Sequence, residues 1–191
     1  MSRSFLVPAV LFAGLLGGAG PSTHADTLPL YGTGVDDNNL ALPGGAADPH
    51  FFVLETRNQA VALSSLWSQW VPNDDNSAWI GWIDDPFPPT GTFTYRTTFD
   101  LTGYDPSTAV LTGDWAADQF GHIVLNGQDT GVSLPDFNWD GGAHPDLNPL
   151  LISAGFVDGI NVLDFVVVEP DGYDGLRVRN LAVSADPVGR R

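Results

Sequence analysis

The sequence contains no cysteine and no lysine, and only two of its 23 acidic residues, Glu55 and Glu169, are glutamates. Without cysteine, no disulfide can stabilise the fold, and four scattered histidines do not suggest a zinc site. The seven basic residues are all arginines, so the formal net charge is −16. Because phosphate groups repel such a chain, we expect neither nucleic acid nor an anionic membrane as a partner.

Only one long apolar segment is present, and it lies at the N-terminus. Arg3 precedes an apolar run over residues 5–20, Pro21 ends the run, and small residues follow at positions 23 and 25. This order is typical of a secretory signal peptide, and the run is short and rich in glycine for a membrane span. We therefore predict a signal peptide over 1–25. The mature protein is expected to be secreted, extracellular or periplasmic, without membrane insertion.

The remaining sequence lacks any convincing amphipathic helix. Aspartate in place of glutamate, with 22 glycines and 15 prolines, favours turns over helices. Residues 91–101 alternate strictly between apolar and polar positions, and Asn126-Gly127 is a strong hairpin signal. Further short strands are expected at 50–55, 59–63, 78–82, 108–116, 122–126, 130–134, 150–153, 161–169 and 176–184. The pattern predicts an all-β fold, a single antiparallel β-sandwich domain over 26–191.

The segments YRTTFDL, TGDWAADQFGHIVLNGQDTG, GFVDGINVLDFVVVE and GLRVRNL resemble, in this order, the galactose-binding-like jelly roll of many carbohydrate-binding modules. With TGVDDNNLALPGGAADPHF and AWIG, the sequence also resembles secreted bacterial domains that often carry a C-terminal Pro-Glu-Pro sorting signal. The resemblance covers nearly all of residues 30–184, but the sequence ends in DPVGRR without that signal, so we expect a released protein. It implies a fold more strongly than an activity, because this fold hosts many functions.

The favoured hypothesis is a secreted, monomeric, non-catalytic carbohydrate-binding module at the cell surface or in the extracellular matrix. Sugar binding needs an apolar platform for the C–H face of the ring and planar polar groups for the hydroxyls. The predicted ligand-binding residues are Trp139, Asp140, Tyr173, Asp118 and Arg177. The alternative for the two loop aromatics is that they close one end of the sandwich.

A structural calcium ion is the one cofactor that the sequence suggests. Galactose-binding-like domains often hold calcium where the first and last strands meet, and by that resemblance Asp36, Asp37 and Asp48 are the expected ligands. No EF-hand loop is present. The alternative is that these aspartates only cap turns.

Catalysis is not expected. Glycosidases rely on a pair of carboxylates facing each other, and the two glutamates lie far apart in the sequence. The chain has no G-x-S-x-G motif and no phosphate-binding loop. Two other functions remain open: a structural or adhesive extracellular domain that binds protein rather than sugar, and a small glycoside hydrolase or lyase.

Overall fold

The computed structural model describes residues 25–68, 70–85, 88–118, 120–134, 147–170, 172 and 174–189. These residues form antiparallel strands and one short 3-10 helix, η1 (Pro106–Thr108). The strands are β1 (Asp26–Pro29), β2 (Ala47–Val53), β3 (Asn58–Ala62), β4 (Ile80–Gly81), β5 (Gly91–Asp100), β6 (Val110–Ala117), β7 (Phe120–Leu125), β8 (Gln128–Leu134), β9 (Asn148–Ile152), β10 (Ile160–Glu169) and β11 (Leu176–Ala185). No helix in this part of the chain is long and apolar enough to cross a membrane.

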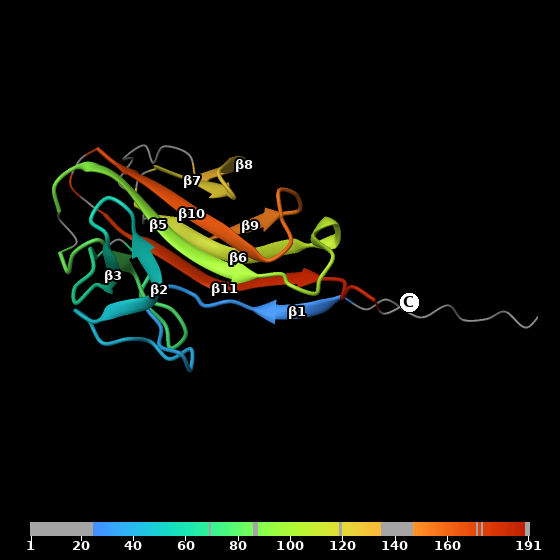
Figure 1. Ribbon diagram of the computed structural model, residues 1–191. Coiled ribbons are helices and arrows are strands. Elements are labelled where there is room, and N and C mark those ends of the chain that lie inside the picture. Colours follow the sequence, from blue (N-terminus) through green and yellow to red (C-terminus); the bar gives the residue numbers. More distant parts are fainter. Residues whose placement is uncertain are drawn as a thin grey trace, which may run out of the picture.

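The strands follow one hydrogen-bonded path in the order β8-β7-β10-β5-β2-β3-β4-β11-β6-β9, with β1 paired to β11 (Figure 1). The path folds over on itself, because the core joins strands from its two halves. The rings of Trp115 on β6 and Phe165 on β10 lie 5.7 Å apart, and β8 contacts β9 without a hydrogen-bonded ladder. The predicted all-β, jelly-roll sandwich is thus confirmed.

Alternation of side chains produces the core, as the sequence predicts. On β5, Phe93, Tyr95 and Phe99 are buried, and their neighbours Thr94 and Thr98 face outward. Trp115 on β6 is also buried and belongs to the core. Layer packing around it is tight: a Cβ added at Gly121 on β7 would lie 2.8 Å from the Trp115 ring. Glycine at this position therefore permits the close approach of the two layers.

The hairpin between β7 and β8 does more than reverse the chain. Asn126 and Gly127 both have positive φ, 52° and 78°, as the Asn-Gly signal predicts. The Asn126 side chain donates to the Gly155 carbonyl and accepts from the Val162 amide, each at 2.9 Å. It also donates to the Asn161 side chain at 2.9 Å. The turn residue thus fastens the loop between β9 and β10 to the hairpin.

One segment differs from the sequence prediction. The residues that follow the predicted signal peptide are rich in turn-forming types, a composition typical of a loop. In the structure, however, Asp26–Pro29 is strand β1. Its four residues pair antiparallel with residues 182–185 of β11, from Asp26↔Ala185 to Pro29↔Ala182. A strand this short has too few positions to show alternation, so pairing with β11 determines its conformation.

Candidate ligand-binding site

A pocket of about 400 Å³ lies between the N-terminal strand, β2 and β5. Four consecutive residues from each of two segments line it, Leu28–Tyr31 and Thr97–Asp100, together with Pro49 and His50. Its volume is within the range of small-molecule sites. A lining built from consecutive residues means that main-chain groups, as well as side chains, border the pocket.

The pocket exists because β2 separates from β5. Their pairing extends to Phe52↔Arg96 and stops there, and the pairing of β2 with β3 shifts register between Ala47 and Phe52. Within this interval the buried Asp48 carboxylate accepts the amides of His50 at 2.8 Å and Gly34 at 2.6 Å. These bonds tie the start of β2 to residue 34 and draw it away from the edge of β5.

Burial has a measurable consequence for Asp48. Desolvation raises its pKa to about 6, although its hydrogen bonds from backbone amides favour the charged form. Hydrogen bonds from the backbone therefore hold the Asp48 carboxyl group in the interior. Below about pH 6 its protonated form predominates.

The edge of β5 that borders the pocket carries main-chain groups with which β2 does not pair. Leu54 donates its amide to the Thr94 carbonyl, so even-numbered residues of β5 direct their backbone groups toward β2. Thr98 and Asp100 are also even-numbered, so their backbone groups point to the same side. β2 does not pair with this part of β5. Together with the Thr98 hydroxyl and the Asp100 carboxylate, this edge offers both donors and acceptors.

An aromatic pair forms another wall of the pocket. The Tyr31 and His50 rings are stacked, with centroids 3.5 Å apart and an interplanar angle of 1°. The His50 Nε2 atom lies 3.5 Å from Asp37 Oδ1, and the His50 side chain is only 13% exposed. Stacking and burial hold the pair in one orientation, so the pocket combines a rigid aromatic wall with a polar strand edge.

Sequence reasoning missed this pocket. It sought aromatic residues in long polar loops, and that search selected Trp139 and Tyr173. A usable signal was present in LPLYG and DPHF, where an aromatic ring follows within two residues of a proline. Nothing in either segment indicated that Tyr31 and His50 would meet.

Three of the predicted ligand-binding residues, Trp139, Asp140 and Tyr173, lie outside the residues that the structure describes. The other two are placed in the interior. Asp118 is 1% exposed and accepts the Trp70 Nε1–H at 2.9 Å, and Trp70 in turn stacks on Trp79 with ring centroids 4.4 Å apart. This position favours a structural role for Asp118 over the predicted contact with a sugar.

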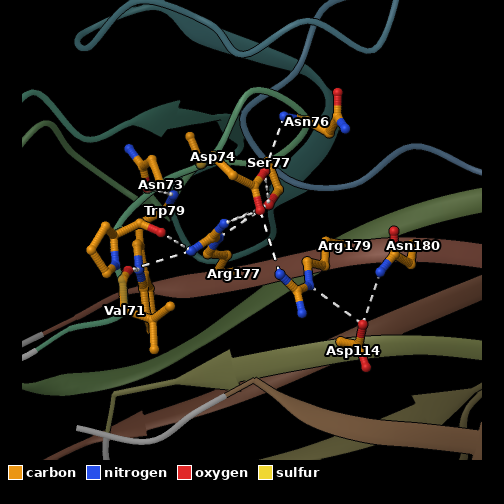
Figure 2. Close-up of polar contacts among 12 residues, drawn as sticks. Val71, Asn73, Asp74, Asn76, Ser77, Trp79, Asp114, Arg177, Arg179 and Asn180 are labelled. Carbon is orange, nitrogen blue, oxygen red and sulfur yellow. Dashed lines mark hydrogen bonds and ion pairs between the residues drawn. The ribbon is translucent and has the colours of Figure 1, made fainter. Parts of the chain in front are cut away.

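Arg177 is likewise buried, with 1% exposure, and Figure 2 shows its guanidinium directed into the loop before β4. It donates to the Ser77 hydroxyl at 2.9 Å, to Asp74 Oδ2 at 2.7 Å and to the Pro72 carbonyl. Burial lowers the pKa of Arg177, and the Asp74 charge opposes that shift. These hydrogen bonds are internal to the protein, so Arg177 connects β11 to residues 71–77. It does not line the pocket.

The three predicted calcium ligands gather near His50, but each has another partner. Asp36 closes a turn by accepting the amides of Asn38 at 2.8 Å and Leu40 at 3.0 Å. Asp37 lies beside His50, and Asp48 binds backbone amides as described above. Within the described ranges, no group of three or more acidic, histidine or cysteine side chains could hold a metal ion. A structural calcium ion remains a prediction.

A second, smaller pocket of about 320 Å³ lies beside the hairpin, between Gln128–Thr130 and Leu151–Gly155. Its floor includes Leu125, and no aromatic residue lines it. Because it lacks an apolar platform for a sugar ring, the pocket beside Tyr31 is the stronger candidate.

Comparisons with known proteins support the fold but not an activity. No protein-family model matches the chain, and no curated protein matches it. Among solved structures, a Stig cyclase, Fisc, from Fischerella sp. TAU is similar over 86% of this chain and 99% of its own. The two are 11% identical, with a TM-score of 0.50. At that identity, the similarity shows only a shared fold.

Other similar structures are related to carbohydrates, at lower TM-scores. One, described as "CBM4 structure and function", is 15% identical with a TM-score of 0.37, over 60% of this chain and 74% of its own. A beta-glucuronidase from an uncultured Clostridium sp. is 13% identical with a TM-score of 0.35, over 52% of this chain. This chain spans only 20% of the length of that enzyme. We base no functional argument on these two similarities.

Proposed function

We propose that this protein is a non-catalytic carbohydrate-binding module and that the pocket beside Tyr31 is its sugar site. One observation carries the proposal: a stacked Tyr31–His50 pair shares a cavity of about 400 Å³ with the hydroxyl and carboxylate groups of Thr97, Thr98 and Asp100. A sugar ring presents an apolar C–H face and a rim of hydroxyls. The aromatic pair suits the C–H face, and the polar groups of the strand suit the hydroxyls.

Proline residues favour a sugar over an extended peptide in this pocket. The Leu30 amide donates to the Leu181 carbonyl, so the backbone groups of Pro29 face the opposite side, toward the pocket. Pro29 has no N–H, and neither has Pro49 in the same lining. A peptide added as a strand beside the N-terminal segment would therefore miss the donor at Pro29. This weakens the alternative of an adhesive domain that binds a protein strand along that wall of the pocket.

The proposal places the protein outside the cytoplasm, at the cell surface or in the extracellular matrix. Its support is the signal-peptide pattern over residues 1–25 and the strongly acidic composition. Calcium is part of the proposal as a stabilising ion at Asp36, Asp37 and Asp48, and not as a contact of the sugar.

A glycan array tests the proposal, with the purified protein in the presence and absence of calcium. Tyr31→Ala should abolish binding, because it removes the aromatic wall. Phe52→Ala is the matched control, since Phe52 is an exposed aromatic on β2 that does not line the pocket. It should bind as the wild type does. Trp139→Ala tests the loop that the sequence predicted.

Each outcome has a clear meaning. Loss of binding in Tyr31→Ala alone supports the proposed site, and loss in Trp139→Ala alone moves the site to the predicted loop. A folded protein that binds no glycan but adheres to matrix proteins would replace the proposal with the adhesive function. Release of reducing sugar from a bound glycan would identify a hydrolase.

A further inference from the structure

The charge around the proposed sugar pocket is of one sign. Asp100 is the only residue of its lining, within the described part of the chain, that carries an acidic or basic side chain other than His50. Its Oδ1 atom accepts both the amide and the hydroxyl of Thr102, at 2.8 and 2.6 Å. These two bonds lower the pKa of Asp100, so the carboxylate is ionised.

The second oxygen of Asp100 differs from the first. Among the residues that the structure describes, no hydrogen bond reaches Asp100 Oδ2. The side chain is exposed and borders the pocket. An ionised oxygen at this position is available to a ligand.

Within the described residues, no ion pair joins a cation to Asp100. The chain has no lysine. Arg96 is two residues from Thr98 on the same face of β5, but Asp164 holds its guanidinium by two hydrogen bonds, at 2.7 and 2.8 Å. His50 Nε2 lies 3.5 Å from Asp37 Oδ1, and His50 also interacts electrostatically with Asp36 and Asp48. Among the described residues, the surroundings of the pocket are therefore net negative. The carboxylates of Asp36, Asp37, Asp48 and Asp100 would together exceed the two charges of a calcium ion bound at the first three.

We propose that the pocket selects sugars with a free, protonated amino group, as in a deacetylated hexosamine polymer. An ammonium group could donate to Asp100 Oδ2 in a charge-assisted hydrogen bond while its ring lies on the aromatic wall. Uronic acids would be repelled, and the net charge of −16 would steer cationic polymers toward the protein. This inference rests on the proposed function, since it specifies the sugar that the same pocket binds.

Four oligosaccharides of equal length test the preference: glucosamine, N-acetylglucosamine, glucose and galacturonic acid oligomers. Affinities are measured by calorimetry at about pH 6, where the amine is protonated, and at low salt. The glucosamine oligomer should bind roughly three- to tenfold more tightly than the acetylated and neutral oligomers. Its advantage should decrease as salt rises toward about 0.5 M, because salt screens exposed charges. The galacturonic acid oligomer should bind most weakly.

Two matched variants separate a local contact from the general charge. Asp100→Asn should remove the preference for the amino sugar, so the affinity for the glucosamine oligomer should fall more than the affinity for the neutral oligomer. Asp105→Asn is the control, because Asp105 Oδ1 accepts the Ser107 amide and hydroxyl at 2.9 and 2.7 Å but does not line the pocket. It should keep the preference.

The outcomes also separate this inference from the proposed function. Equal affinity for amino and acetylated oligomers, with binding still dependent on Tyr31, would overturn the amino-sugar preference alone. An equal loss in Asp100→Asn and Asp105→Asn would assign the preference to the overall charge and overturn the role of Asp100. If none of the four oligosaccharides binds, the amino-sugar preference is overturned, and the glycan array decides the proposed function.

Discussion

Asp74 and Asp100 begin turns in the same way, yet they belong to regions with opposite roles. In each, Oδ1 accepts the amide two residues later, from Asn76 at 3.0 Å and from Thr102 at 2.8 Å. The difference lies in the second oxygen. Asp74 Oδ2 binds Arg177 at 2.7 Å and lies 3.5 Å from Arg179 (Figure 2). Asp100 lines the pocket, and its Oδ2 accepts no hydrogen bond from the described residues.

The comparison shows why residue type alone does not identify a binding site. The cluster around Arg177 contains arginine, aspartate and asparagine, which are typical sugar-binding residues, but they bind one another. Arg179 and Asn180 both contact Asp114 Oδ2, at 3.4 and 2.9 Å, which completes the cluster on the β6 side. The pocket beside Tyr31 has fewer polar groups, but one of them, Asp100 Oδ2, accepts no hydrogen bond from the described residues. A site is marked by groups that the fold leaves unused.

The largest effect on stability is expected from Arg177→Ala. It leaves Asp74 and the carbonyls of residues 71 and 72 without their buried donor, and we expect a loss of about 3–5 kcal/mol in the free energy of unfolding. Arg179→Ala is the control: Arg179 is 39% exposed, and its loss should cost about 1 kcal/mol or less. Urea denaturation measures both. Similar losses in the two variants would contradict the structural assignment of Arg177.

Changing pH should separate buried from exposed carboxyl groups. Desolvation raises the pKa of Asp174 to about 7 and that of Asp48 to about 6. The Tyr95 hydroxyl donates to the Asp174 carboxylate. Between about pH 4 and 7 the folded state therefore binds more protons than the unfolded state. Each unit by which a pKa is raised corresponds to about 1.4 kcal/mol. The free energy of unfolding should therefore fall by several kcal/mol as pH rises through this window.

Melting temperatures from pH 4 to pH 8 test this expectation, with Asp174→Asn as the informative variant. Asparagine cannot ionise but can still accept the Tyr95 hydroxyl, so the decline with pH should become shallower. Asp36 and Asp105 are only partly buried, and hydrogen bonds lower their pKa values. Asp36 receives these bonds from backbone amides, and Asp105 receives them chiefly from the Ser107 hydroxyl. Their contribution should be lost only below about pH 4. A protein that gains stability from pH 4 to 7 would contradict the assignment.

A smaller effect is expected at the hairpin. Asn126→Gly removes the side-chain bonds to Gly155, Asn161 and Val162, while glycine adopts the φ of 52° without strain. We expect a loss of about 1–2 kcal/mol. Asn126→Ala should cost about 1 kcal/mol more, because alanine is strained at positive φ. Equal values for both variants, measured by thermal denaturation, would show that the backbone conformation contributes little.

The smallest effect should come from the two matched aspartates. Asp100→Asn and Asp105→Asn keep an acceptor for the turn amide, and both positions are at or near the surface. Neither should shift the melting temperature measurably. A large loss of stability in Asp100→Asn alone would mean that its carboxylate supports the fold rather than a ligand.

Local sequence patterns predicted most of the elements and little of the site. The alternation on β5 and the Asn126-Gly127 turn depend on neighbouring residues, and both are confirmed. The burial of Asp118 and Arg177 was not foreseeable, because polar side chains enter the interior only where distant segments supply partners. For Arg177 those partners are about 100 residues away in the sequence, at Asp74 and Ser77.

The sequence by itself therefore determined an acidic, cysteine-free chain of short alternating strands, and hence the antiparallel sandwich. Only the tertiary structure decided where a pocket opens and which residues line it. The departure of β2 from β5 depends on Asp48 reaching the amide of Gly34, and the aromatic wall depends on Tyr31 meeting His50. Both contacts join the N-terminal segment to β2, and no local pattern of hydrophobicity or turn residues encodes such a meeting.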